Sequence, residues 1–428
     1  MKPVYLLLIT FLFQSKSDAQ LYYPPITGTV WETLAPESLG WCEDSIEVLY
    51  DYLEATNSKA FIVLKDGKIV LEKYFGTFTQ ASPHVWNSAG KTLTAIAVGI
   101  AQEEGFLSIE DTTSDYLGQG WTSLTPAQEE KITIRHQLTM TTGLDDGTAD
   151  FFCTDPACLT YLAEPGTRWA YHNGPYTLLD SVIEVATGMT LNDWTTTRIE
   201  SITGMTGQFY PIDYNNIFIS NARSMARFGL LLQSGGVWNG TPVLDDPGYF
   251  NEMTHSSQTI NRSYGYLTWL NGQSSYMIPQ SQLVIPGSAM PNAPADVYAA
   301  LGKNSQLINV APTDGLVLIR MGESDGNSLV STQYNDTIWQ YVNRLSCTLE
   351  TTETELSTIG ISPNPSHTQV TLTGWLAEDS VTVYDPSGKT VALPFTNGIA
   401  ATSHLSPGMY LLSVERSGNR KVLRLIIN

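Results

Sequence analysis

The two ends of the first three-quarters of the chain carry the same pair of elements in opposite order. A helical pattern precedes a β-hairpin near the N-terminus, where Asp66-Gly67 marks the turn, and a second hairpin precedes a helix that ends near residue 345. Hairpin strands pair antiparallel, and each helix must bury its apolar stripe against a sheet. We therefore predict one antiparallel sheet with both terminal helices on one face. The helices are predicted over residues 41–55 and 332–345, and the strands over 60–65, 68–75, 307–310 and 316–321.

Helical patterns fill the region between the hairpins. A glycine closes two of them, Gly105 after the first and Gly235 after the last. The sequence thus predicts an α/β (α+β) fold in which helices flank the antiparallel sheet and form a helical subdomain. The patterns cover residues 88–104, 134–141, 176–186 and 222–232.

The pattern changes after residue 353. A polar segment rich in Thr and Glu, 348–357, suits a linker, and short alternating strands with turns between them follow it. We predict a domain over residues 20–353 and a small β-sandwich over 354–428. The sandwich strands are predicted over 370–373, 381–384, 389–393, 410–414 and 422–427.

The first residues have the pattern of a secretory signal. Lys2 supplies the charged start, residues 4–13 form a short apolar run, and Ser17-Asp18-Ala19 fits a cleavage site. We predict a signal peptide over residues 1–19. An uncleaved anchor is the alternative, although the run is short for a membrane span.

Charge and cysteine content narrow the class of protein. The net charge of -20 disfavours nucleic acid and anionic membranes as partners, and 42% apolar residues suit a globular core. In an exported chain the four cysteines are expected to form disulfides. Cys153–Cys158 and Cys42–Cys347 are the preferred pairs among three possible connectivities. No metal-ligand spacing is present, so we predict neither a metal nor an organic cofactor.

Ser88-Ala-Gly-Lys91 is the first candidate for a catalytic site. The serine and the lysine lie three residues apart at the start of a predicted helix, so their side chains share a face. A serine nucleophile needs a base within hydrogen-bonding reach, and a buried neutral lysine can serve. The pair alone is weak evidence, because a chain of this composition is expected to contain about one such pair by chance.

Two other catalytic or binding motifs are only partly matched by the sequence. Gly90-Lys91-Thr92 resembles the end of a phosphate-binding loop, but Val85 stands where that loop requires glycine. Gly322-Glu-Ser324-Asp-Gly326 matches a nucleophile elbow, but the only later histidines, His367 and His404, fall in the predicted sandwich.

A Tyr-x-Asn triplet gives Ser88 its context. The run from Glu164 to Leu179 contains Tyr171-His172-Asn173 within a Pro-Gly, Trp and Tyr-x-Leu-Leu frame. Together with Ser88-x-x-Lys91, this run resembles the serine hydrolases of the class C β-lactamase and penicillin-binding-protein-like superfamily. The resemblance covers most of residues 41–347. It extends to His136–Leu144, Ser224–Leu230 and Ala300–Gln306.

The resemblance implies a role for each matching position. Ser88 would be the acylated nucleophile, Lys91 its activator, Tyr171 the partner acid or base, and Asn173 the residue that orients Lys91 or the substrate. The oxyanion hole would consist of two backbone N–H groups, from Ser88 and from the strand at Lys303. Candidates for lining the pocket are Trp86, His172, Trp269 and Asn304. Core packing is the alternative for the two tryptophans, and packing or a position behind the catalytic residues is the alternative for His172.

The third motif departs from the family pattern. Where β-lactamases and cell-wall peptidases carry Lys-Thr-Gly, this chain has Gly302-Lys303-Asn304-Ser305-Gln306. This resembles the esterase and amide-hydrolase branches, which implies a small ester or amide as substrate. The alternatives are a β-lactamase or D-amino-acid-specific peptidase of the same fold, and an inactive surface binding protein.

The C-terminal segment has a resemblance of its own. Ile361–Ser366, Val383–Lys389 and Leu405–Leu411 resemble the sorting domain of the type IX secretion system. This implies the secretion machinery as a partner and a location outside the cell or on the outer-membrane surface. A generic binding sandwich is the alternative.

Overall fold

The computed structural model describes residues 21–323, 329–347, 358–416 and 419–428. The predicted signal peptide, the whole predicted linker and Ser324 of the rejected elbow lie outside these ranges. The chain divides into two compact units, with the boundary between Ser346 and Cys347.

The first unit is built on the predicted antiparallel sheet. Its six strands lie in the order β2-β1-β13-β12-β11-β8, so the two predicted hairpins meet where β1 pairs with β13. Both hairpins and both terminal helices are confirmed. The strands are β1 Ser58–Lys65, β2 Lys68–Tyr74, β8 Trp269–Leu270, β11 Tyr298–Gly302, β12 Gln306–Ala311 and β13 Leu316–Gly322.

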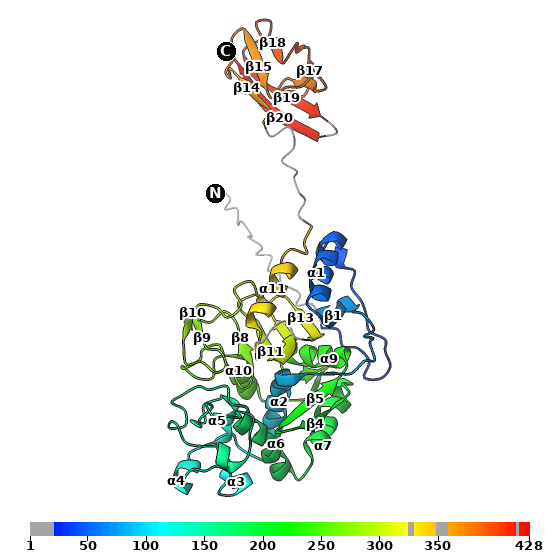
Figure 1. Cartoon of the computed structure of the whole chain (residues 1–428). Helices are drawn as coiled ribbons and strands as arrows, with labels where there is room; N and C mark the ends of the chain where they lie inside the picture. Colours follow the sequence, from blue (N-terminus) through cyan, green and yellow to red (C-terminus); the bar gives the residue numbers. More distant parts are fainter. Residues whose placement is uncertain (1–20, 324–328, 348–357, 417–418) are drawn as a thin grey trace, which may run out of the picture. The chain divides into compact units, whose positions relative to one another are not determined.

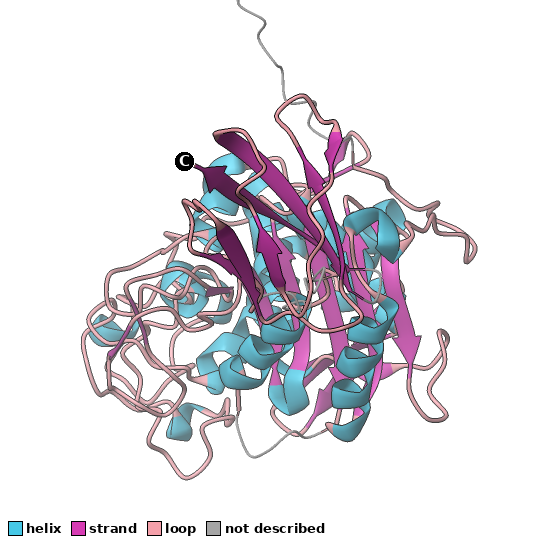
Figure 2. Ribbon diagram, turned by 90° about the horizontal axis from the view of Figure 1, so that it is seen from above, coloured by secondary structure: helices cyan, strands magenta, loops and turns pink. Residues whose placement is uncertain are grey.

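Adjacent residues of β12 show how the helices cover the sheet. Ile308 faces α9 (Ala222–Gln233), where Gly229 lets the helix approach the strands closely. Asn309 points to the opposite face and exchanges two amide hydrogen bonds, of 2.9 and 2.7 Å, with Asn335 of α11 (Thr332–Val342). α1 (Glu43–Ala55) lies beside α11, and Tyr52 stacks on Tyr341 with ring centroids 4.6 Å apart. The sheet is thus enclosed between two layers of helices (Figures 1 and 2).

The chain between the two hairpins holds the other helices of this unit, and α2 and α6 pack against each other within it (Figure 1). α5 is shorter than the predicted helix over 134–141, because Met140 adopts a left-handed φ of 58° and the chain turns there. These helices are α2 Gly90–Glu103, α3 Ser114–Leu117, α4 Pro126–Glu129, α5 Ile134–Leu138, α6 Asn173–Thr187, α7 Leu191–Thr195, α8 Ser201–Thr203 and α10 Pro247–Thr254. The short strands around them are β3 His84–Val85, β4 Gly207–Ile212, β5 Asn215–Ser220, β6 Val237–Trp238, β7 Thr241–Pro242, β9 Ser275–Tyr276 and β10 Ile285–Pro286.

The second unit is the predicted small β-sandwich. One sheet has the order β14-β15-β18 and the other β17-β16-β19-β20. Alternate residues such as Leu412 and Val414 of β19 face a buried apolar core, as the period of two requires. The strands are β14 Gly360–Ser362, β15 Gln369–Thr373, β16 Ser380–Tyr384, β17 Thr390–Val391, β18 Ile399–Ala401, β19 Gly408–Arg416 and β20 Asn419–Ile427.

The cysteines agree with the preferred connectivity. Cys153 and Cys158 are joined by a disulfide. Cys42 and Cys347 are each disulfide-bonded, and no cysteine of the described residues is free, as the predicted pairing requires.

Replacing Gly229 should loosen the contact between α9 and the sheet. In Gly229→Ala the added Cβ would collide with Val317 Cγ1 and lie 3.2 Å from Ile308 Cγ2. We expect the free energy of unfolding to fall by about 1–3 kcal/mol, measured by denaturant unfolding. Gly90→Ala is the matched control, since its Cβ would meet only Phe218 at 3.5 Å. Equal stability of the two variants would contradict the tight packing.

Candidate active site

Ser88 lies in a short 3-10 turn, Asn87–Ala89, that leads directly into α2. Its side chain is partly exposed, whereas α2 is buried from Gly90 to Ala101. α2 has no charged residue between Lys91 and Glu103, which is typical of a helix buried on all sides. The sequence thus holds Ser88 at the solvent-accessible end of a rigid central helix.

The Lys91 amine lies at the centre of the site. Lys91 Nζ donates hydrogen bonds to Ser88 Oγ at 3.2 Å and to Asn173 Oδ1 at 2.7 Å. The side chain is only 3% exposed, and this burial lowers the pKa of Lys91 from 10.5 to about 7, opposed by the charge of Asp180. A large fraction of this lysine is therefore neutral at neutral pH and able to accept a proton.

Asn173 is placed by the start of α6. The helix begins at Asn173, and Gly188 closes it in a left-handed conformation with φ 71°. Tyr176, one turn further along, presents its ring 4.0 Å from Lys91 Nζ. The polar amide and the aromatic face together hold the amine without a carboxylate partner in contact.

Tyr171 is enclosed by aromatic side chains. Its ring centroid lies 5.7 Å from that of Trp269 and 6.3 Å from that of Tyr264, and Trp169 packs on the same group. The Tyr171 hydroxyl is buried and makes no hydrogen bond within the described residues. Burial raises the pKa of Tyr171 above the usual 10, and the neighbouring Ser88 hydroxyl opposes this rise. Tyr171 therefore remains protonated at neutral pH. Burial lowers the pKa of Lys91 and raises that of Tyr171, so at neutral pH the first group can accept a proton and the second can donate one.

The third motif lies against the serine. A Cβ at Gly302, the last residue of β11, would lie 3.1 Å from the Ser88 backbone nitrogen. The Lys303 carbonyl accepts a hydrogen bond of 2.8 Å from the Asn87 side-chain amide, while the Lys303 side chain is exposed. Asn304, with φ 61°, is partly buried in the following turn. The backbone of this turn thus borders the site.

Two of the predicted pocket residues, Trp86 and His172, are buried in the protein. Trp86 is fully buried, packs on Phe218 and Phe228, and donates to Ser220 Oγ at 2.7 Å, so it holds the turn before Ser88 from behind. His172 is also buried, and both ring nitrogens are without hydrogen-bond partners. Burial lowers the pKa of His172 to about 4, so it is neutral at neutral pH.

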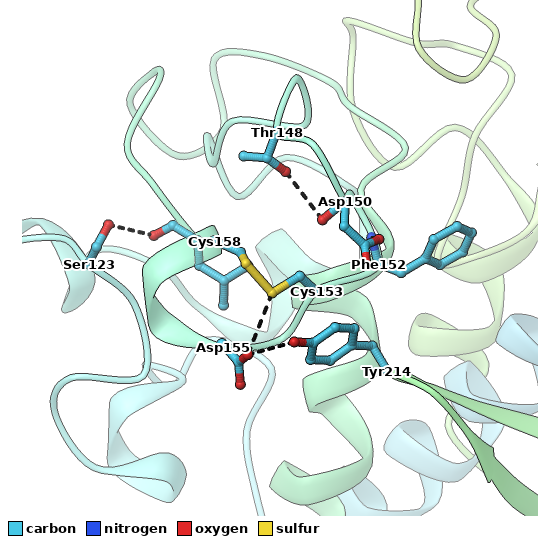
Figure 3. The surroundings of a disulfide bond; sticks show 9 residues. Ser123, Thr148, Asp150, Phe152, Cys153, Asp155, Cys158 and Tyr214 are labelled. Carbon is cyan, nitrogen blue, oxygen red and sulfur yellow. Dashed lines mark hydrogen bonds between the residues drawn. A yellow bond between two sulfur atoms is a disulfide. The ribbon is translucent and has the colours of Figure 1, made fainter.

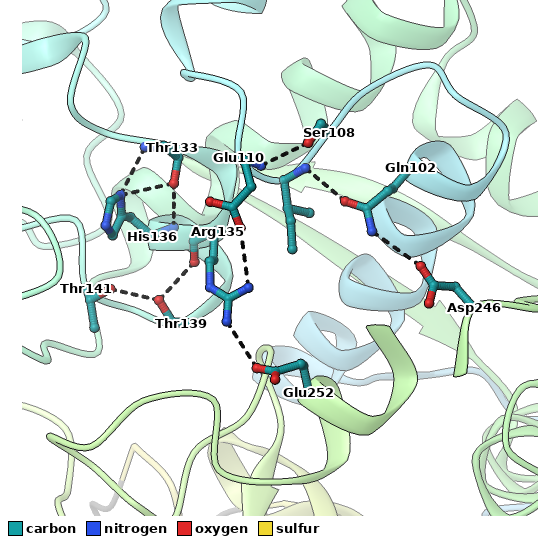
Figure 4. A network of polar contacts seen from close by, with 11 residues as sticks. Gln102, Ser108, Glu110, Thr133, Arg135, His136, Thr139, Thr141, Asp246 and Glu252 are labelled. Atoms are coloured by element: carbon teal, nitrogen blue, oxygen red, sulfur yellow. Dashed lines mark hydrogen bonds and ion pairs between the residues drawn. The ribbon is translucent and has the colours of Figure 1, made fainter. Parts of the chain in front are cut away.

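The segment around His136 contacts residues 169–175, the stretch that contains Tyr171. Met140 carbonyl accepts a hydrogen bond of 2.9 Å from the Ala170 backbone, and Gln137 Nε2 donates to the Pro175 carbonyl at 2.6 Å. Figure 4 shows how this segment is itself fixed: Arg135 bridges two glutamates, and His136 closes a capping box with Thr133. The segment His136–Leu144, to which the family resemblance extends, therefore helps to position residues 169–175.

The disulfide loop packs on the start of α6. The Phe151 carbonyl accepts a hydrogen bond of 3.1 Å from the Gly174 backbone, and any side chain at Gly174 would collide with the Cys153 carbonyl. Figure 3 shows Asp155, inside the loop, accepting a hydrogen bond of 2.6 Å from the Tyr214 hydroxyl. This loop borders the site through Gly174, next to Asn173.

Sequence reasoning missed Arg320, which holds the turn after Gly302. It is fully buried in β13 and donates to the carbonyls of Asn304 and Ser305 at 2.7 and 2.9 Å. The one signal was a charged residue within the apolar run Leu-Val-Leu-Ile-Arg-Met. Sequence reasoning also missed Tyr176 and Asp180, because nothing in a helical pattern shows which polar side chain faces the interior.

The Beta-lactamase family matches residues 51–321, which is more than half of the chain. The chain belongs to this family. Its members are serine hydrolases that include esterases and amidases. Among curated proteins, penicillin-binding protein 4* of Bacillus subtilis is 31% identical over 168 residues, which is 34% of this chain and 36% of that protein's length.

Solved structures share the fold. A provisionally assigned β-lactamase from Bacteroides dorei has a TM-score of 0.57 at 17% identity, covering 72% of this chain and 99% of its own. A provisionally assigned 6-aminohexanoate-dimer hydrolase from Bacillus anthracis has a TM-score of 0.55 at 20% identity, covering 70% of this chain and 83% of its own. A family VIII carboxylesterase has a TM-score of 0.53 at 14% identity, covering 72% and 99%. At these identities the likeness shows the fold alone.

Residues 360–428 match the secretion system C-terminal sorting domain. This type IX sorting domain indicates export to the cell surface or the extracellular space, as predicted. Within the described ranges, no helix is long and apolar enough to cross a membrane, and no three metal-binding side chains converge on one point.

Replacing Gly302 should displace the Ser88 turn. In Gly302→Ala the added Cβ would collide with the Trp86 carbonyl and lie 2.9 Å from the Ala89 nitrogen. We expect the reaction of Ser88 with a fluorophosphonate probe to slow by about 100-fold, followed by intact-protein mass spectrometry. Gly248→Ala, whose new Cβ would meet only the end of the Asp246 side chain, is the control. An unchanged labelling rate in Gly302→Ala would rule out this close approach.

Proposed function

We propose that the chain is an exported serine hydrolase that cleaves small esters or amides through an acyl-enzyme on Ser88. The observation that carries the proposal is the buried Lys91 amine, 3.2 Å from the Ser88 hydroxyl and with its pKa lowered to about 7. An amine in this state can take the serine proton as oxygen attacks the substrate carbonyl carbon.

Asn173 gives the amine its direction. Its Oδ1 accepts one N–H of Lys91, which leaves the nitrogen lone pair free to face Ser88 Oγ. The attack forms the oxygen–carbon bond, moves the carbonyl electrons onto oxygen and transfers the serine proton to Lys91. The backbone N–H groups of Ser88 and Lys303 are proposed to stabilise that oxyanion.

Tyr171 then acts as the acid for the leaving group. The hydroxyl remains protonated at neutral pH because it is buried beside Ser88. It donates its proton to the departing alkoxide or amine and recovers one from Lys91. A water molecule then attacks the acyl carbon and gives a proton to Lys91. The bond between Ser88 Oγ and the acyl carbon breaks, Oγ receives a proton through Tyr171 and Lys91, and the acid is released.

The substrate class follows from the third motif. The Lys-Thr-Gly that helps β-lactamases and cell-wall peptidases bind the substrate carboxylate is replaced here by Lys303-Asn304-Ser305, and the Lys303 side chain is exposed. This favours uncharged esters and amides. The solved structures named as a carboxylesterase and as a 6-aminohexanoate-dimer hydrolase are consistent with either bond. A β-lactamase or D-amino-acid-specific peptidase remains the second candidate, supported by the penicillin-binding relative.

Removing the serine oxygen should abolish activity. In Ser88→Ala, kcat/KM for a p-nitrophenyl ester should fall on the order of 10⁴-fold or more, and the fluorophosphonate adduct should disappear from the mass spectrum. Ser38→Ala, an exposed serine of the N-terminal segment, is the control. Full activity in Ser88→Ala would point to an inactive scaffold at this site. Rapid acylation by penicillin with slow release would instead favour the peptidase alternative.

The pH dependence should report the lysine. Lys91 acts as a base only when neutral, so kcat/KM should rise with pH and level off above an apparent pKa near 7. In Asn173→Asp a carboxylate replaces the amide 2.7 Å from Nζ and favours the charged amine, which should move the rise to higher pH. The profile is measured with a substrate whose own charge is constant. A rise at the same pH in both proteins would exclude Lys91 as the base.

A further inference from the structure

Tyr264 is a fully buried tyrosine that the proposed mechanism does not use. It precedes β8 by a short turn and is 0% exposed, and its hydroxyl has no hydrogen-bond partner within the described residues. Buried polar groups in folded proteins almost always have a partner, because an unpaired one has lost its hydration for nothing. The Tyr264 hydroxyl therefore calls for an explanation.

Tyr264 belongs to the aromatic group that encloses Tyr171. Its ring centroid lies 6.3 Å from that of Tyr171 with the ring planes at 86°, 5.5 Å from Trp169 and 5.0 Å from Trp269. Trp169 Nε1, which can only donate, is also buried without a partner in the described part of the chain. Two hydrogen-bond donors without acceptors thus lie in the group of rings around Tyr171.

The turn that carries Tyr264 is fixed to the catalytic helix. Tyr264 and Trp269 pair as an antiparallel bridge, so the chain reverses between them. At the tip of this turn the Leu267 carbonyl accepts a hydrogen bond of 2.8 Å from Thr92 Oγ1. Thr92 directly follows Lys91 in α2. The same helix therefore holds both the amine and the turn that places Tyr264 against Tyr171.

Tyr171 becomes anionic during the proposed reaction. It gives its proton to the leaving group and carries a negative charge until Lys91 returns a proton. Burial raises the pKa of Tyr171, so its surroundings disfavour this anion. Burial also raises the pKa of Tyr264, and a charge on Tyr171 raises it further. Tyr264 thus keeps its proton when Tyr171 loses one, and its hydroxyl remains a donor.

We propose that Tyr264 is a positioning residue whose hydroxyl donates a hydrogen bond to the Tyr171 oxygen while that oxygen lacks its proton. Tyr264 transfers no proton and forms no covalent bond. Because its hydroxyl is not engaged elsewhere, it breaks no other hydrogen bond when the charge develops, as suits a preorganised donor. The inference rests on the proposed function, since it requires Tyr171 to act as the acid.

The test compares an ethyl ester and a p-nitrophenyl ester of the same acid. The departing ethoxide needs the Tyr171 proton, whereas p-nitrophenolate leaves without one. In Tyr264→Phe we expect kcat/KM to fall about 10- to 100-fold for the ethyl ester and to change less than about 2-fold for the p-nitrophenyl ester. Deacylation should also slow, because Ser88 Oγ is then the leaving group. The acyl-enzyme should therefore accumulate, as intact-protein mass spectrometry would show.

Tyr266→Phe is the matched control. Tyr266 is equally buried, but its ring packs on Tyr249 and Arg135. This variant should hydrolyse both esters as the wild type does. Equal ethyl-ester rates in Tyr264→Phe and Tyr266→Phe would overturn the inference. Equal slowing of both esters, or slower fluorophosphonate labelling of Ser88, in Tyr264→Phe would also overturn it, because the hydroxyl would then support the fold rather than the acid.

The outcome for the wild type separates this inference from the proposed function. If wild-type Ser88 forms no acyl-enzyme with either ester, the proposed function fails and the role of Tyr264 fails with it. If the wild type and Tyr264→Phe turn over both esters equally, only the role of Tyr264 is overturned.

Discussion

Burial of the Lys91 amine is the constraint on which the rest of the N-terminal unit depends. An ammonium group loses hydration when it is enclosed, so the protein must either neutralise the charge or provide polar neighbours. Here it does both in part, because the pKa falls to about 7 while the Asn173 oxygen and the Tyr176 ring contact the nitrogen. These contacts require α2 and α6 to pack closely, and α2 can be buried because no charge follows Lys91 until Glu103.

The backbone around the serine is held from three directions. Gly302 brings the end of β11 against the Ser88 turn, Trp86 fills the space behind it, and buried Arg320 binds the carbonyls of the turn that follows Gly302. Asn87 and Asn304 both adopt positive φ, of 48° and 61°. Strained residues are retained where the surrounding structure fixes them, and such positions cluster at functional sites. The rigid setting favours a preorganised oxyanion site over one assembled by movement.

The charges near the site are arranged at two depths. In the proposed mechanism Tyr171 is the neutral acid beside the serine and Lys91 is the base, and Asp180 is buried one turn beyond Tyr176. The charge of Asp180 opposes the lowering of the Lys91 pKa, and Lys91 likewise lowers the pKa of Asp180, so the protonation of each buried group depends on the other. The helix that presents Asn173 to the lysine therefore also carries the acid whose charge acts on the lysine.

The sequence by itself determined the sheet, the terminal helices, the sandwich and the pair Ser88 and Lys91. These depend on local patterns: hairpin turns, periods of two and 3.6 residues, and a helix that fixes i and i+3 on one face. Three other points depend on contacts between residues far apart in the chain. They are the charge state of Lys91, the choice of tryptophan that lines the site, and the choice of helical carboxylate that is buried. Trp86 and Trp269 are both almost fully buried, yet only Trp269 joins the aromatic group around Tyr171. Tertiary packing alone decided these points, because it sets the desolvation and neighbouring charges that fix each group's chemistry.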